Sequence, residues 1–284
     1  MLRSLGVNAL TITPDVVVLQ DGRERAVLVC GNAHTTSVDL PLSETGVAAV
    51  LEASRDLTPQ GLKTVILTRE PDADRLPLSM LAGVQIVRAE RKEMDEWEWD
   101  DVPSDLLNTP DVSVHVVRFH KTLADDDGHT FHVEPCLGSR QSLAVIIQPE
   151  NILVCCDELH TNLPPNIRPG TVHETLMRLQ DWRLRCPKVI VPASGIPIEG
   201  EDVARTLDKS IQYVRDLYRL TRMGITESKL PWERLVYTIP VNGVWDTAIT
   251  DRCIQERHRS NVRSMAEDIS RRIQAEAEEA SIVA

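Results

Sequence analysis

Short runs of valine, isoleucine and leucine recur along the chain, and they constrain its fold more than any other feature. Runs bounded by turn residues are typical of β-strands, and a fully apolar centre, as in 64–68, indicates a strand buried on both faces. A turn at 21–23 between the first two runs indicates a hairpin. The predicted strands are 15–20, 26–30, 64–68, 84–89, 112–119, 130–136, 142–148, 152–156 and 188–192.

Helical spacing of apolar residues separates these strands. Helices are predicted at 47–57, 171–185, 203–220 and 251–280, and a further one is expected to open at 76–81. Hairpin strands followed by strand and helix units fit an α/β fold, a four-layer αββα sandwich with C-terminal helices. Periodicity alone leaves other α/β layouts open. The acidic stretch 90–105 carries Trp97 and Trp99, which predicts an exposed loop or insertion that anchors onto the body or onto a partner.

The charge balance excludes two classes of partner. The 31 basic and 43 acidic residues give a net charge of −12, and such a surface repels nucleic-acid phosphates and anionic lipid heads. No apolar run spans a membrane, and Asn8 and Pro14 interrupt the N-terminal stretch, so neither a membrane helix nor a signal peptide is expected. The six cysteines are expected to be buried thiols of a cytoplasmic protein.

The segment VILTREPDADR, after the predicted strand 64–68, resembles the T-H-x-H-x-D-H loop of the metallo-β-lactamase superfamily. In one register, carboxylates replace two histidines, the aspartate is kept and an arginine replaces the last histidine. These positions are Glu70, Asp72, Asp74 and Arg75. With Thr68 held in place, the matched residues are instead Arg69, Pro71, Ala73 and Asp74.

Two later loops are similar to the same superfamily. In CLGSRQSLAVIIQPENILVCCDEL, Gly138 takes a metal-site histidine position and Asp157 takes the place of the metal-bridging aspartate. In VIVPASGIPI, Ser194 takes a histidine position and Gly195 is retained. The segment 256–269 resembles, more weakly, a closing helix of some hydrolase-like members.

The resemblance implies a metallo-β-lactamase-like domain over 1–224 and a C-terminal segment with a long helix over 225–284. None of the family's five ligand histidines stands at its matched position, and zinc favours imidazole or thiolate ligands. Zinc is therefore not expected, and neither is any other cofactor. The alternative is a hard divalent ion, Mn, Mg or Fe, on Asp72, Asp74 and Asp157, because oxygen ligands suit such ions.

The acidic loop after 64–68 has three readings that the residues leave open. It is a solvated acidic turn with an internal arginine pair, a ligand pocket without metal chemistry, or the site of a hard divalent ion. The pocket residues are expected to be Glu70, Asp72, Asp74, Arg75, Gly138 and Gly195, and the catalytic candidates are Asp157, His160 and Ser194.

Other groups favour structural roles. His129, in the string GHT, lies too far before Asp157 for the family spacing, so it is expected to be a turn residue. Cys156 is expected to pack in the core. A triad on Ser194 needs a nearby histidine, which sequence alone does not place.

Two functions follow from the resemblance, and whether the protein is an enzyme stays open. The first is a non-zinc pseudoenzyme that binds a small molecule or a protein partner. The second is a hydrolase or lyase with a rebuilt site that acts on an ester, thioester or lactone. The long final helix and the tryptophans are compatible with a homodimer.

Overall fold

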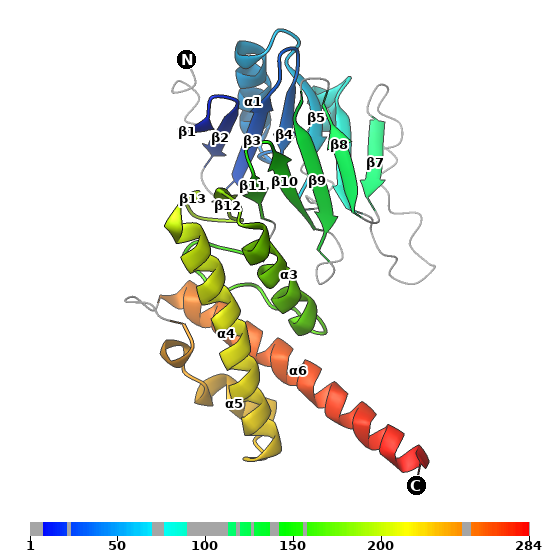
Figure 1. Ribbon diagram of the computed structural model, residues 1–284, viewed down its shortest axis with the longest axis vertical. Coiled ribbons are helices and arrows are strands. Elements are labelled where there is room, and N and C mark those ends of the chain that lie inside the picture. The colour runs from blue at the N-terminus through cyan, green and yellow to red at the C-terminus, as the bar shows by residue number, and fades with distance from the viewer. Residues whose placement is uncertain are drawn as a thin grey trace. The chain divides into compact units, whose positions relative to one another are not determined.

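The computed structural model describes residues 8–21, 24–69, 77–89, 113–117, 120–125, 128–136, 142–155, 158–245 and 251–283 (Figure 1). These residues form two compact units. The first comprises the described residues up to Cys155, and the second comprises those from Glu158 onward.

The first unit begins with a seven-stranded sheet in the order β1-β2-β3-β4-β5-β6-β7. Its first four strands pair antiparallel, and the pairs from β4 to β7 are parallel. The strands are β1 (Asn8–Thr13), β2 (Val16–Asp21), β3 (Glu24–Cys30), β4 (Thr35–Val38), β5 (Leu62–Ile66), β6 (Gln85–Ala89) and β7 (Ser113–Val117).

A second set of strands in this unit pairs antiparallel in the order β8-β9-β10-β11. They are β8 (Lys121–Ala124), β9 (Thr130–Pro135), β10 (Leu143–Gln148) and β11 (Ile152–Val154). Backbone bonds join the two sheets just after β5. The amide of Leu143 donates to the carbonyl of Thr68 at 2.8 Å, and Arg69 forms a bridge with Ser142. The segment after β5 therefore lies beside the start of β10.

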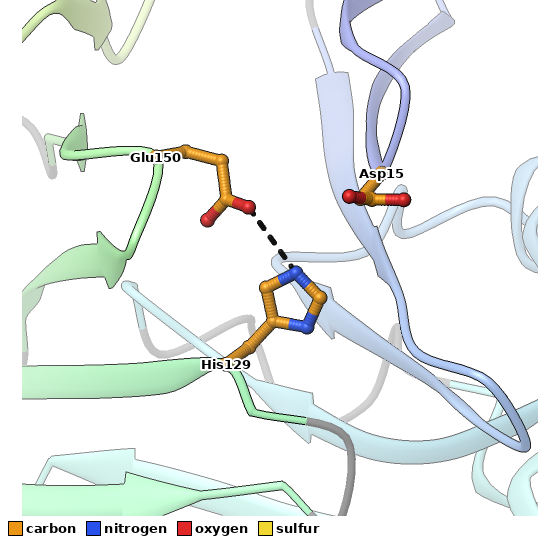
Figure 2. Close-up of side chains that lie close together, drawn as sticks. All are labelled: Asp15, His129 and Glu150. Carbon is orange, nitrogen blue, oxygen red and sulfur yellow. Dashed lines mark ion pairs between the residues drawn. The ribbon is translucent and has the colours of Figure 1, made fainter.

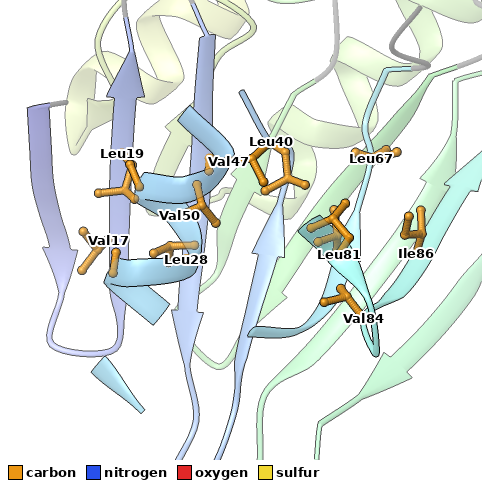
Figure 3. Close-up of a cluster of buried hydrophobic side chains, with 14 residues drawn as sticks. Val17, Leu19, Leu28, Leu40, Val47, Val50, Leu67, Leu81, Val84 and Ile86 are labelled. Carbon is orange, nitrogen blue, oxygen red and sulfur yellow. The ribbon is translucent and has the colours of Figure 1, made fainter. Parts of the chain in front are cut away.

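The core of the first sheet follows the two-residue period of its strands. Val17 and Leu19 of β2 belong to a buried cluster with Val47 and Val50 of α1 (Glu44–Leu57), which covers this face (Figure 3). The alternate residue Val18 is buried too, on the opposite face. Each such side chain contributes about 1.5–3 kcal/mol on burial. Burial on both faces explains why these strands are continuously apolar.

The ends of α1 follow ordinary helix chemistry. The Ser43 hydroxyl caps the helix by accepting the Gly46 amide at 3.0 Å, and Glu44 places a carboxylate in the positively polarised first turn. Gly46 is needed because an added Cβ would lie 2.4 Å from the Cβ of Pro41.

The second unit is mainly helical (Figure 1). The helix α3 packs against α4, and α6 packs against both α4 and α5. Residues 271–279 at the far end of α6 are exposed. The elements are α3 (Val172–Arg185), β12 (Val189–Val191), β13 (Ile198–Glu199), α4 (Glu201–Thr226), α5 (Trp232–Thr238), η5 (Val241–Gly243) and α6 (Arg252–Val283).

A buried polar network joins α4 and α6 at the centre of the second unit. The Asn261 amide group donates to the Tyr213 hydroxyl at 3.1 Å and to the Pro165 carbonyl at 2.8 Å. The Tyr213 hydroxyl lies 3.0 Å from His258 Nδ1, and His258 Nε2 lies 2.9 Å from the Ile239 carbonyl. Because each buried polar group has a partner, the network fixes the relative position of the two helices.

Most predicted strands and helices are confirmed, with bounds that differ by at most two or three residues. Some helices differ in type or length, and some elements were missed. The segment predicted to open a helix at 76–81 is the short 3-10 helix η3 (Leu78–Leu81), and 203–220 is part of the longer α4. The elements β1, β4, β8, β13, α5 and η5 were not predicted. Cys186 and Cys253 are exposed, so the expectation that all the cysteines are buried is wrong.

Trp97 and Trp99 lie outside the described residues. The predicted domain boundary near residue 224 stays a prediction. Among the described residues, no helix combines the length and the apolar character that crossing a membrane requires.

Candidate functional site

The structure describes three of the residues predicted to form the site: His160, Ser194 and Gly195. The remaining candidates lie outside the described residues: Glu70, Asp72, Asp74, Arg75, Gly138 and Asp157. Cys156 lies outside them as well.

His160 and Ser194 are brought together by two short backbone bonds in the second unit. The amide of Ala193, just after β12, donates to the Leu159 carbonyl at 2.9 Å, and the amide of Thr161 donates to the Ser194 carbonyl at 3.2 Å. The side chains between these bonds meet, so that His160 Nδ1 lies 2.7 Å from Ser194 Oγ. Two of the three catalytic candidates are therefore in direct contact.

Gly195 permits this close approach of the two loops. Its φ is +100°, a conformation that disfavours any residue with a Cβ, and an added Cβ would lie 2.4 Å from the Thr161 hydroxyl oxygen. The Thr161 hydroxyl also donates to the Ile196 carbonyl at 3.0 Å. The retained glycine thus has a local structural role beside Ser194.

Arg257 of α6 completes this cluster, and sequence reasoning missed it. Its Nη1 lies 3.2 Å from His160 Nε2, although the two residues are 97 positions apart in the chain. A guanidinium only donates, so Nε2 accepts this bond, and a neutral His160 carries its proton on Nδ1. The Nδ1–H group then donates to Ser194 Oγ. The only sequence signal for Arg257 was its place in the segment that resembles a closing helix.

A buried ion pair holds the loop that carries His160. The guanidinium of Arg178, on α3, donates to the Glu158 carboxylate, and the two side chains are only 10% and 5% exposed. The Glu158 carbonyl also accepts the Asn166 amide at 3.2 Å. The segment at 158–160 is thereby fixed to α3.

The end of β5 in the first unit has its own polar cluster. Asp39 accepts the Thr68 amide at 2.7 Å and the Thr68 hydroxyl at 2.6 Å. Burial raises the pKa of Asp39, while the charges of Arg69 and Arg25 and the bonds from Thr68 act in the opposite direction. Burial also disfavours the charged form of Arg25, and it is the main reason why the pKa of Arg25 is lowered. Thr68 thus fixes the start of the segment that resembles the family's first metal loop.

Two further histidines, His120 and His129, belong to the first unit and are not part of the cluster around Ser194. His129 lies in the turn between β8 and β9, as expected of a turn residue, but it is buried and flanked by carboxylates. His120 is exposed and lies 3.6 Å from the Glu134 carboxylate.

Several solved structures resemble this chain. A metallo-beta-lactamase family protein from Thermus thermophilus is 16% identical with a TM-score of 0.59, and the match covers 95% of this chain and 94% of that protein. A beta-lactamase domain protein from Burkholderia ambifaria is 13% identical with a TM-score of 0.59, and the match covers 91% and 86%. No protein-family model and no curated protein matches the sequence.

A sec-alkylsulfatase, Pisa1 from Pseudomonas sp., is 10% identical with a TM-score of 0.62 over 92% of this chain. The chain spans only about half of that enzyme's length, 50%. At such identities the matches establish the fold alone. The chain has the metallo-β-lactamase fold, and the predicted α/β class is confirmed.

Proposed function

We propose that this protein is a metallo-β-lactamase-fold binding protein that recognises a small anionic group and lacks the zinc hydrolase chemistry of its fold. The observation that carries the proposal is the position of the His160 imidazole, which lies between the Ser194 hydroxyl and the Arg257 guanidinium. The hydroxyl and the guanidinium offer hydrogen-bond donors to a ligand, and the guanidinium adds a permanent positive charge.

The described residues of this cluster do not suit a zinc ion. Zinc binds imidazole nitrogen, thiolate or carboxylate at about 2.0–2.3 Å. Ser194 offers a neutral hydroxyl, and the His160 nitrogens already face Ser194 Oγ at 2.7 Å and Arg257 Nη1 at 3.2 Å. A cation on Nε2 would have to displace a guanidinium and tolerate its charge. This disagreement supports the absence of zinc from the cluster.

The same hydrogen bonds argue against Ser194 as a nucleophile. A serine nucleophile needs a histidine nitrogen that accepts its proton. Arg257 donates to Nε2, which leaves the proton of a neutral imidazole on Nδ1, the nitrogen that faces Ser194. The histidine then donates to the hydroxyl and does not accept from it. The arrangement is that of a binding site.

An anion is the ligand that this chemistry favours. A guanidinium presents planar N–H donors that match carboxylate, phosphate and sulfate oxygens, and a serine hydroxyl adds a further donor. Arg257 is half-buried, where a charge is screened less than at an open surface.

The test compares anion binding by the full chain and by an Arg257→Met variant. Calorimetric titration with inorganic phosphate and with sulfate is expected to show binding that the variant loses by about tenfold or more, because a charged hydrogen bond contributes about 1.5–3 kcal/mol. Arg259→Met, two residues away on the same helix, is the matched control and is expected to bind as the parent does.

Three results would overturn the proposal. They are equal anion binding by the parent and Arg257→Met, stoichiometric zinc that survives dialysis in the parent but is lost in Asp157→Ala, and turnover of an activated ester that disappears in Ser194→Ala. Turnover that depends on added Mn²⁺, Mg²⁺ or Fe²⁺ and disappears in Asp157→Ala would instead support the rebuilt hydrolase or lyase.

A further inference from the structure

Three turns of the first unit bring ionisable side chains together at one place (Figure 2). Asp15 lies in the turn between β1 and β2, His129 directly precedes β9, and Glu150 lies in the turn between β10 and β11. One ligand atom from each of these side chains lies within 4.8 Å of the others. The cluster joins a turn of the seven-stranded sheet to two turns of the second sheet.

Asp125 fixes the orientation of the His129 ring. Its carboxylate accepts the His129 amide at 2.8 Å, and its other oxygen lies 3.1 Å from His129 Nδ1. An ionised carboxylate only accepts, so the imidazole proton lies on Nδ1. The lone pair on Nε2 of the neutral ring then faces Oε1 of Glu150 at 3.3 Å. Two electron-rich atoms at this distance require a positive species between them, either a proton or a metal ion.

Glu150 points independently to a missing partner. Its side chain is only 10% exposed, and its second oxygen, Oε2, is buried without a hydrogen-bond partner among the residues that the structure describes. Within the described part of the chain, neither Asp15 nor Glu150 forms an ion pair with an arginine or a lysine. Protonation of His129 would still leave a surplus of negative charge, because Asp15, Asp125 and Glu150 surround one imidazole. An unpartnered buried carboxylate oxygen is costly unless a ligand satisfies it.

We propose that Asp15, His129 and Glu150 bind a divalent first-row transition-metal ion, with His129 Nε2 and the two carboxylates as ligands. Asp125 acts as a positioning residue, since a ligating histidine commonly donates its other N–H to a carboxylate. Two ligands at ~2.1 Å from a tetrahedral ion lie about 3.4 Å apart. The His129 to Glu150 distance of 3.3 Å meets this requirement. Asp15 is exposed in its turn, where it can approach as the third ligand.

This site is separate from Thr68 and Arg69, which belong to the segment that resembles the family's first metal loop. β10 begins beside Ser142, next to Arg69, and ends just before Glu150. A six-residue strand spans roughly 20 Å, so the two places lie at opposite ends of β10. An ion here would link three turns of the two sheets, which is a stabilising role. One imidazole with two carboxylates suits Zn²⁺ or Mn²⁺ better than Mg²⁺.

The experiment measures metal binding and thermal unfolding of the full chain after treatment with a chelator. Calorimetric titration with Zn²⁺ is expected to show one binding site. Titration with Mn²⁺, followed by the loss of its free-ion paramagnetic resonance signal, is expected to show one site as well. The Tm is expected to rise as metal is added. Asp125→Asn is expected to weaken binding by about 10- to 100-fold. Asp15→Asn and Glu150→Gln are expected to weaken it at least as much. His132→Gln, three residues along the same segment, is the control and is expected to bind metal normally.

Because Asp15 is exposed, Asp15→Asn tests the ligand without disturbing the core. Equal affinity in Asp15→Asn and the parent would overturn the inference, because Asp15 would then not be a ligand. The absence of any Zn²⁺ or Mn²⁺ binding would also overturn it and would leave a proton as the positive charge that His129 and Glu150 share. Metal binding that persists in Asp15→Asn but is lost in Asp157→Ala would overturn it in favour of an ion at the family position.

Discussion

The imidazole Nδ1 of His160 lies 2.7 Å from the hydroxyl oxygen of Ser194, a residue 34 positions further along the chain. The contact depends on the backbone bonds between the loop at 159–161 and the loop after β12. Arg257 faces the opposite nitrogen of the same ring. His160 thus bridges a hydroxyl and a guanidinium, and this bridge determines what chemistry the cluster can carry out.

Replacing Ser194 by alanine is expected to destabilise the protein. The Nδ1–H group of His160, itself buried, would lose its acceptor, and an unsatisfied donor of this kind costs about 1–3 kcal/mol. Urea unfolding should therefore give a lower midpoint with an unchanged slope. Ser194→Thr keeps the hydroxyl and should lose less. Equal midpoints for Ser194→Ala and the parent would mean that the bond contributes nothing to stability.

Much of the fold was predictable because its strands are apolar on both faces. The run 64–68 predicted the strand β5, although only its last two residues, Val65 and Ile66, are buried. The range 171–185 predicted α3 to within one residue. The strand β4 was missed because its sequence, TTSV, is polar although every residue in it is buried. Thr35 is satisfied there by the Thr58 hydroxyl at 2.9 Å. A strand stabilised by such long-range partners leaves no hydrophobic signal in the sequence.

The candidate site was predictable only in part. Ser194 and Gly195 follow directly from the end of a buried strand, and His160 lies shortly after the predicted strand 152–156. Arg257 reaches His160 because α6 packs against the loop that follows His160, where Asn261 bonds Pro165 and Ile167, and no sequence spacing reveals this tertiary contact. The proximity of Asp15 and Glu150 also depends on a tertiary contact, because the two residues lie in turns of two different sheets.

Glu158→Gln is expected to be strongly destabilising. The buried Arg178 would lose the carboxylate charge of Glu158, and breaking one half of a buried ion pair costs about 3–5 kcal/mol. Removing both charges in Arg178→Met/Glu158→Gln should cost less than Glu158→Gln alone. Asp202→Asn, which removes an exposed ion pair with Arg205, is the matched control and should leave the midpoint unchanged. A Glu158→Gln variant as stable as this control would contradict the prediction.

The stability of the second unit should depend on the protonation of His258. Burial lowers the pKa of His258, and the Arg259 charge adds to this effect, while the bond to the Ile239 carbonyl opposes it. In the unfolded chain the residue takes up its proton near pH 6.5, but the folded protein resists protonation until the pH is lower. The free energy of unfolding should therefore fall below about pH 6.5, by at most about 1.4 kcal/mol per pH unit from this group.

The His258→Gln variant lacks this titration and isolates the contribution. The difference in unfolding free energy between the parent and the variant should shrink as the pH is lowered from 8 to 5.5. A difference that stays constant, or grows, over that range would show that His258 is not held in its neutral form.

Gly195→Ala tests whether the contact between the two loops requires glycine. The substitution forces a side chain into a backbone with φ of +100° and against the Thr161 hydroxyl, and such backbone strain alone costs about 1–3 kcal/mol. Thr161→Gly removes the clash but not the strain, so the double variant should recover part of the lost stability, and the two changes should not be additive. Urea unfolding of both single variants and the double variant measures this coupling. Strictly additive effects would mean that the loops adjust independently, and the geometry that holds His160 against Ser194 would then not depend on Gly195.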